Sequence, residues 1–453
     1  MDALATPTDT GFFGHPRGLA YLAFTEAWER FSYYGMTALV LLYMNQQLLL
    51  PGHIEHVAGM AGFRHALESV FGPLNTQALS SQIYGLYTGF VYFTPIIGGY
   101  VADRWLGARR TVVIGSVLMS AGHFAMAFDR SFLVALLLLV VGTGCLKGNI
   151  SAQVGRLYAH DDEAMRTRGY TIFSMGINVG AVAGPLVCGW LGESYSWHLG
   201  FGLAGVLMLA AMVTYLAGRR HLPAEEPKRA RQVEAKARLT RAERRTVLLL
   251  FAVMVITIFQ SIAYYQITDA GILWVDAHAD MATPLGRIPT SWFNAIDSFF
   301  SIVAVPPLFA LWRWQARRGG EPSDVAKIGI GAAIVVGANL LLALAAALAG
   351  QGRVTVLLPF IAFAATGVAF LYYWPTLLTL VSQAAPAKLN ATLMGTAFLT
   401  LFVSNILIGW IGGLYSAIDP VSFWLLQAAI SSGGVVLVLL FGRSLARALE
   451  PVA

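Results

Sequence analysis

The sequence predicts an all-α membrane protein of twelve transmembrane helices in two six-helix bundles, and three observations lead to this fold class. The 453 residues are 57% hydrophobic and only 12% charged, whereas a soluble domain carries about 25% charged residues. The apolar residues gather into twelve segments, each near the roughly 20 residues that cross a bilayer as a helix. A basic stretch separates six of these segments from the other six. This composition excludes a soluble enzyme, a disordered chain and a nucleic-acid-binding protein.

The twelve expected spans follow one another with short connections. The first six lie at 19–47, 78–102, 111–129, 131–157, 170–192 and 198–217, and the second six at 246–275, 290–312, 325–349, 354–382, 389–415 and 420–442. The first span is not expected to be a signal peptide, because Glu26, Glu29 and Arg30 interrupt its apolar run and no small-residue cleavage site follows.

Lys and Arg residues indicate the orientation of the spans, because cytoplasmic loops are enriched in them. Most of the 30 lie at the N-terminus, in the even-numbered loops, in the central linker and at the C-terminus. Those on the opposite face are Arg64, Arg130, Arg287 and Arg353. We therefore expect an inner-membrane protein with both termini in the cytoplasm. The net charge of +6 is then a topology signal and does not indicate a nucleic-acid partner.

The basic linker at 218–245 divides the chain into an N-terminal bundle at 1–217 and a C-terminal bundle at 246–453. It is expected either to lie along the anionic inner leaflet as a basic, partly helical strap or to be a solvated tether. Two six-helix halves joined by such a loop are a common layout of transporters, which bind substrate near the midplane of the membrane between the halves.

The loop between the second and third spans carries the run Gly98-Gly-Tyr-Val-Ala-Asp103-Arg-Trp-Leu-Gly-Ala-Arg109-Arg110. Paired glycines let helices approach closely, and an acid–base pair at a helix end can latch the cytoplasmic side. This spacing resembles the loop motif of the major facilitator superfamily, which has the same twelve-helix layout. The resemblance implies a gating loop made by Gly98, Gly99, Asp103, Arg104, Gly107 and Arg109.

Six ionisable residues remain inside the expected spans once the loops are set aside. They are Glu26, Glu29, Arg30, Lys147, Asp269 and Asp297. Ionisable groups within a membrane are costly and usually functional. Four acids face two bases, so an acid without a cationic partner takes up a proton when it is desolvated. The sequence therefore predicts at least one acid that can be protonated near pH 7, which suits a proton-coupled carrier.

The spacing of these charges indicates which of them meet. Glu26 precedes Glu29 by three residues and Arg30 by four, so span 1 presents all three on neighbouring turns. Lys147 lies more than two turns from either end of its span, which is too deep for the side chain to snorkel to the interface. It needs a carboxylate, and the glutamates of span 1 are the obvious partners. The alternative is an ion pair within span 1 that only locks helix packing.

Four segments of the first half carry a more specific pattern. They are Glu26-Ala-Trp-Glu29-Arg30-Phe-Ser-Tyr33-Tyr34-Gly35 and the runs at 91–99, 142–151 and 173–180. Together they resemble the motifs of the proton-dependent oligopeptide transporter (POT) family in order and in span. The resemblance implies proton-coupled symport of di- and tripeptides by alternating access, without a cofactor or a metal.

The resemblance also implies a role for each residue of the site. Arg30 and Lys147 would hold the peptide carboxylate, and Glu26, Glu29 and Lys147 would couple transport to protons, with Glu26 as the first choice. The residues implied to contact the peptide backbone are Tyr33, Tyr34, Tyr92 and Asn178. Taken without the resemblance, each tyrosine and the asparagine would be interpreted as a helix-packing residue.

The second half departs from the family pattern. The glutamate of span 10 that would receive the peptide's amino group is Phe370 here, and the pocket tryptophan of span 11 is Ala397. Asp269 in span 7 and Asp297 in span 8 are acids that the family lacks at those positions. Each of them either compensates as a substrate ligand or is a structural acid that faces water.

Other functions of the same fold stay open at this point. The run Gly180-x-x-x-Gly184-Pro185 resembles an antiporter motif, so a drug/proton antiporter is one alternative, and a carrier of another small anion is the second. Arg30 and Lys147 favour an anionic or zwitterionic substrate over a lipophilic cation. An enzyme is not expected, because the sequence has no Walker A loop and no HExxH motif. We expect a monomer whose partners are a peptide, protons and the lipid bilayer.

Overall fold

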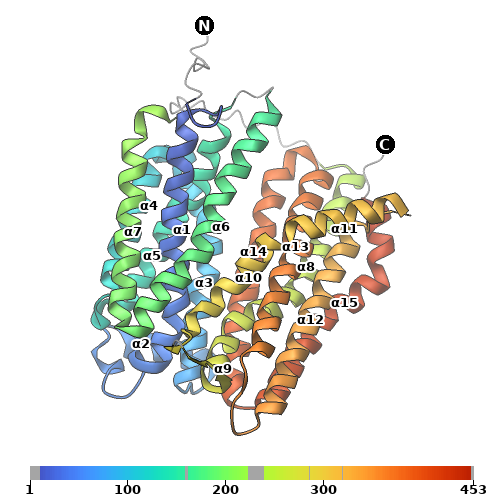
Figure 1. The fold of residues 1–453 in the computed structure, drawn as a ribbon. Helices are drawn as coiled ribbons and strands as arrows, with labels where there is room; N and C mark the ends of the chain where they lie inside the picture. Colours follow the sequence, from blue (N-terminus) through green and yellow to red (C-terminus); the bar gives the residue numbers. More distant parts are fainter. Residues whose placement is uncertain (1–10, 159–161, 223–238, 285, 319, 450–453) are drawn as a thin grey trace. The chain divides into compact units, whose positions relative to one another are not determined.

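The computed structural model describes residues 11–158, 162–222, 239–284, 286–318 and 320–449, and these residues are nearly all helical (Figure 1). Residues 223–238, which hold most of the expected basic linker, lie outside the described part of the chain. The chain forms two compact units. Met1–His65 and Phe93–Gln232 make the first unit, and Ala66–Tyr92 and Val233–Ala453 make the second.

The first unit is a bundle of long helices. It contains α1 (Arg17–Tyr43), α4 (Ala108–Ala125), α5 (Phe132–Gly155), α6 (Glu163–Ser194), α7 (Trp197–Ala217) and the second part of α3 (Thr76–Val101). Shorter helical segments are η1 (Met44–Leu48), η2 (Ile54–His56), η3 (Ala102–Leu106), η4 (Asp129–Ser131) and η5 (Arg219–His221). Helix α2 (Met60–Phe71) lies in the connection between α1 and α3 and straddles the boundary of the two units.

The second unit contains the first part of α3 and the remaining helices. These are α8 (Arg241–Thr268), α9 (Ala270–His278), α10 (Phe293–Val303), α11 (Val305–Arg318), α12 (Asp324–Ala349), α13 (Leu357–Ala384), α14 (Asn390–Gly412) and α15 (Pro420–Leu449), with η6 (Thr290–Trp292), η7 (Ala387–Leu389) and η8 (Gly413–Ser416). Strand β1 (Ala279–Asp280) pairs in parallel with β4 (Val354–Thr355), and β2 (Ala282–Thr283) pairs antiparallel with β3 (Gly286–Arg287).

Each expected span coincides with one long helix or one broken pair of helices, which confirms the fold class. Within the described residues, eight such helices are long and apolar enough to cross a membrane, and the pair Thr290–Val303 and Val305–Arg318, bent by 41°, makes a ninth. Helices α1, α3 and α4 fall short of that test because charged and polar residues interrupt them, including the three charges of α1. The protein is therefore an integral membrane protein.

Besides the bent pair, two further details of the second unit differ from the expected spans. The seventh span is broken at Asp269, where α8 ends and α9 begins. The tenth was expected to start at Val354, but Val354 and Thr355 form strand β4 and the helix begins at Leu357. Val354 and Thr355 are β-branched residues, which favour an extended backbone over a helix.

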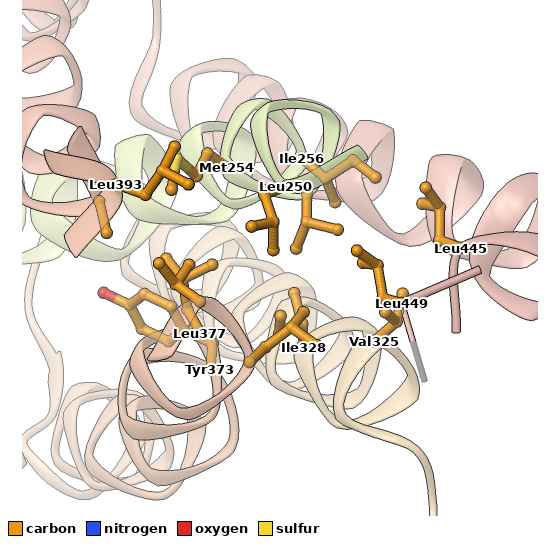
Figure 2. Close-up of a cluster of buried hydrophobic side chains, with 14 residues drawn as sticks. Leu250, Met254, Ile256, Val325, Ile328, Tyr373, Leu377, Leu393, Leu445 and Leu449 are labelled. Carbon is orange, nitrogen blue, oxygen red and sulfur yellow. The ribbon is translucent and has the colours of Figure 1, made fainter. Parts of the chain in front are cut away.

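The hydrophobic core of the second unit fixes its helices against one another. Figure 2 shows aliphatic side chains of α8, α12, α13, α14 and α15 that point toward one another, among them Leu250, Ile328 and Leu377. All three are fully buried. Such a cluster makes the second unit a rigid support for polar residues that the same helices carry.

Candidate functional site

Three charged residues of α1 form a buried cluster in the first unit. The exposed fractions are 2% for Glu26, 0% for Glu29 and 2% for Arg30. Arg30 Nε donates a hydrogen bond of 2.9 Å to Glu26 Oε1 and lies 2.5 Å from Glu29 Oε2. One guanidinium thus compensates two carboxylates at once, as the spacing along α1 predicts.

The cluster leaves several polar atoms available for a ligand or a proton. Within the described residues, Glu26 Oε2, Glu29 Oε1 and Arg30 Nη2 are buried and make no hydrogen bond. Burying such atoms without a partner is costly. Arg30 Nη2 can therefore donate a hydrogen bond to an anion, and each carboxylate has an oxygen that can accept a proton.

Close packing of α1 against α6 holds Arg30 in place. Gly176, Gly180 and Gly184 recur every four residues on α6 and face α1. A Cβ atom added to Gly180 would lie 2.6 Å from the Cβ of Arg30, and one added to Gly184 would lie 2.6 Å from the carbonyl oxygen of Phe31. Only glycine allows the two helix backbones to approach this closely.

Lys147 joins the cluster from α5. It is half-buried and interacts electrostatically with Arg30, Glu29 and Glu26. Its helix packs tightly against the second part of α3, where a Cβ added to Gly98 would lie 2.0 Å from the carbonyl oxygen of Gly144. Gly144 lies one turn before Lys147, so the α3–α5 contact sets the position of the lysine. The structure thus brings together the two cations and two acids of the predicted site.

Tyr33 and Tyr34 complete this group on α1. The Arg30 guanidinium lies 5.4 Å from the centre of the Tyr33 ring, which is a cation–π distance. The Tyr33 and Tyr34 rings meet edge to face with their centres 5.2 Å apart. The guanidinium therefore packs on the Tyr33 ring, and the Tyr33 ring packs on the Tyr34 ring.

Sequence reasoning missed a buried histidine that contacts α1. His123 on α4 is fully buried, and its Nε2 lies 2.8 Å from Ser32 Oγ. Ser32 donates its only hydroxyl proton to the carbonyl oxygen of Ala204, so His123 Nε2 carries a proton and donates it to Ser32. The signal was a histidine inside the expected span at 111–129, which the count of charged residues treats as neutral.

The second unit holds Asp297 in a group of aromatic residues. Tyr264 Oη donates a hydrogen bond of 2.8 Å to Asp297 Oδ2, and the backbone nitrogen of Ser298 donates to Oδ1. The Tyr264 ring lies 6.3 Å from the ring of Phe370 and 6.0 Å from that of Tyr373. Phe370, at the position where the resemblance implies a glutamate, is therefore part of an aromatic cluster next to an acid.

Asp269 has a different environment in the same unit. It is fully buried at the break between α8 and α9. Its carboxylate accepts hydrogen bonds of 3.0 Å from Ser81 Oγ and 2.9 Å from Gln266 Nε2. Within the described residues it forms no ion pair. Both oxygens are used by neutral donors, which fits a structural acid.

Two further predicted contacts lie away from the charged cluster or outside its unit. Tyr92 belongs to the second unit, where its Oη lies 3.3 Å from Tyr265 Oη. Asn178 is exposed on α6. It lies two residues from Gly176 and Gly180 and therefore on the side of the helix away from α1.

The predicted gating loop is a π-helical turn between α3 and α4. Asp103 and Arg104 are exposed in η3, and neither forms an ion pair among the residues described. Gly107 has a φ of +80°, a conformation that L-residues rarely adopt, so a glycine is needed there to begin α4. Arg109 donates a hydrogen bond of 2.5 Å to the carbonyl oxygen of Leu222, which ties α4 to the segment after α7. In the described part of the chain, no three His, Cys, Asp or Glu side chains gather as metal ligands.

Comparisons with known proteins agree with the predicted family. The model of the POT family matches residues 109–242 and 226–425. An uncharacterized transporter of Bacillus subtilis, YclF, is 30% identical over 95% of this chain and 94% of its own length. A di-/tripeptide transporter of Lactococcus lactis subsp. cremoris is 29% identical over 96% of each chain.

A solved structure extends the likeness to the fold. A POT peptide transporter in complex with alafosfalin superposes with a TM-score of 0.85 and 26% identity, over 99% of this chain and 100% of that one. The sequence motifs, the charged cluster and these matches lead to the same assignment. This chain belongs to the POT family of transporters.

Proposed function

We propose that this chain is a symporter that carries di- and tripeptides together with protons across the inner membrane by alternating access. The observation that carries the proposal is the charged cluster of Glu26, Glu29, Arg30 and Lys147, in a chain whose relatives include di-/tripeptide transporters. Both termini lie in the cytoplasm in this proposal, because the loops on that side hold most of the Lys and Arg residues.

Charge balance supplies the coupling mechanism. In the empty carrier two cations face two carboxylates, which is a neutral set. A peptide carboxylate that binds Arg30 Nη2 adds a third negative charge to a desolvated site, where like charges repel strongly. Protonation of one glutamate restores neutrality at the least cost. Proton binding and peptide binding therefore favour each other, as thermodynamic linkage requires.

Protonation of one glutamate also allows the carrier to switch the side of the membrane to which its binding site opens. Each glutamate holds Arg30 through one oxygen and keeps the other oxygen without a hydrogen bond in the described residues. A proton on that carboxylate removes its charge and weakens its hold on Arg30. We propose Glu26 and Glu29 as the coupling acids, and the experiment must test both.

Asp297 is proposed as the site for the peptide's amino group. It is half-buried beside the rings of Tyr264 and Phe370, and one hydroxyl and one backbone amide already orient its carboxylate. Asp269 is fully buried with both oxygens engaged, so we propose that it has a structural role.

The decisive experiment uses purified protein in liposomes with a panel of dipeptides. An inward proton gradient should drive accumulation of at least some peptides, and counterflow should persist without the gradient. Gradient-driven uptake of another small anion, with no peptide carried, would contradict peptide transport. Exchange of a lipophilic cation for protons would instead indicate an antiporter.

A further inference from the structure

A basic cavity lies between the ends of α4 and α7 in the first unit, apart from the charged cluster. It has a volume of about 470 Å³, and the residues that line it are Arg109, Arg110, Val113 and Ile114 of α4 together with Tyr215, Leu216 and Arg219. A second cavity of similar volume shares Arg109, Leu216 and Arg219 and adds Arg220. The two are neighbouring parts of one hollow, which we name the α4–α7 hollow.

The rim of the α4–α7 hollow is strongly cationic. Arg110, Arg219 and Arg220 are exposed, while Arg109 is held by the carbonyl oxygen of Leu222. Among the described residues that line it, no acid balances these four charges. Guanidinium groups present paired N–H donors whose geometry matches a phosphate. The rim therefore fits an anionic phosphate ester.

The wall of the hollow is apolar and continues onto exposed helix faces. Ile114 on α4 is 40% exposed and Leu216 on α7 is 43% exposed. One turn further into the membrane, Val117 on α4 and Val213 on α7 are also exposed. Exposed apolar side chains on a membrane-spanning helix lie against acyl chains, so the hollow joins a cationic rim to a surface that contacts lipid.

We propose that the α4–α7 hollow binds one anionic phospholipid of the inner leaflet, with its headgroup phosphate at Arg110, Arg219 and Arg220 and an acyl chain along Ile114 and Leu216. A free phosphate ion would satisfy only the rim and would leave the apolar wall unused. Basic pockets between membrane helices at the cytoplasmic side bind anionic headgroups in this way. This site involves neither the peptide nor the proton, so it goes beyond the proposed transport function.

Binding of phosphatidylglycerol to the full-length protein in detergent, measured by native mass spectrometry against phosphatidylcholine, tests the site. The variant Arg110→Gln/Arg219→Gln/Arg220→Gln should weaken phosphatidylglycerol binding roughly 100-fold, because it removes three charges at the headgroup. A matched control, Arg317→Gln/Arg443→Gln/Arg447→Gln, removes three exposed arginines of the same predicted face outside this hollow. The control should bind phosphatidylglycerol as the wild type does.

Further measurements distinguish binding of a lipid from binding of a free anion. Ile114→Ser should weaken phosphatidylglycerol binding, while inorganic phosphate alone should neither bind tightly nor displace the lipid. Equal losses in the two triple variants would overturn the proposal in favour of a diffuse basic face. Displacement of the lipid by inorganic phosphate would overturn it in favour of a free-anion site. The folding of the triple variant is checked by its elution in size-exclusion chromatography and its helical content by circular dichroism, both of which should match the wild type.

Discussion

The two units bury their acids in opposite ways. In the first unit Glu26 and Glu29 are paired with a buried cation, at 2.9 Å and 2.5 Å from Arg30 Nε. In the second unit Asp269 and Asp297 accept hydrogen bonds from neutral hydroxyl, amide and backbone donors, with no cationic partner among the described residues. The first unit compensates its carboxylates with a cation, and the second unit stabilises its carboxylates with hydrogen bonds from neutral donors.

This difference indicates where proton coupling can occur. When a buried ion pair loses one partner, the other is left as an uncompensated charge, which costs several kcal/mol. The first unit must therefore respond to any change of charge, whether it comes from a proton or from a substrate carboxylate. A carboxylate held by neutral donors depends on no second charge, so the second unit can orient a substrate without taking part in coupling.

The largest effect is expected from Lys147→Ala. Removing this cation leaves Arg30 to balance both glutamates and the substrate carboxylate, so proton-driven uptake in proteoliposomes should be abolished. The variant should still fold, because the stranded acid can be protonated. Lys388→Ala is the matched control, since its 3.0 Å ion pair with Glu243 lies near solvent, which weakens such a pair. Wild-type uptake by Lys147→Ala would leave the lysine a structural role.

The next largest effect is expected from replacing Glu26 and Glu29, the proposed coupling acids. Glu26→Gln and Glu29→Gln mimic a permanently protonated acid, so the variant at the coupling position should lose accumulation against a gradient yet retain peptide exchange. Glu163→Gln, at an exposed acid, is the control. Raising the pH should reduce wild-type accumulation and should leave exchange by the coupling variant unchanged.

If Glu26→Gln and Glu29→Gln both accumulate peptide normally, the assignment of proton coupling to the first unit is wrong. The proton would then travel through the second unit, with Asp269 and Asp297 as the carriers. The same assay applied to Asp269→Asn and Asp297→Asn would locate it.

A smaller effect is expected from the glycine that seats Arg30. Gly180→Ala places a Cβ atom 2.6 Å from the Cβ of Arg30, so α1 and α6 must separate at a cost of about 1–3 kcal/mol. We expect a lower midpoint of thermal unfolding and weaker uptake together. Gly202→Ala is the control, because nothing lies within 4 Å of its added Cβ, and alanine favours a helix over glycine. A stable Gly180→Ala with normal uptake would show that the glycine contact does not position Arg30.

The charged cluster was predictable from the sequence because charged residues stand out within apolar spans and their spacing shows which of them share a helix face. Glu26, Glu29 and Arg30 share one face of a helix by spacing alone, and Lys147 needs an acid because it is too deep to reach water. The twelve spans were predictable for a similar reason, since apolar runs of this length have one stable arrangement in lipid.

Neutral polar contacts leave no such pattern. The hydrogen bond from Tyr264 to Asp297 joins α8 to α10 and depends on helix packing that no local spacing encodes. His123 was overlooked because its partner, Ser32, is a neutral residue 91 positions away. The break at Asp269 was not predicted because the run at 246–275 is apolar on both sides of it.

The smallest effect is expected from Tyr264→Phe in the second unit. The substitution keeps the ring among Phe370 and Tyr373 and removes only the hydroxyl that donates 2.8 Å to Asp297. If Asp297 only orients the peptide's amino group, the KM for uptake should rise about threefold to tenfold, the range of one hydrogen bond. The ratio of accumulation to exchange should stay at its wild-type value, because charge balance in the first unit is untouched. Tyr415→Phe, which removes a hydroxyl from a tyrosine stacked edge-on against Phe423, is the control. The contrary outcome is a Tyr264→Phe carrier that exchanges peptide but no longer accumulates it. A neutral donor of the second unit would then take part in proton coupling. The proposed division of roles between the two units would be wrong.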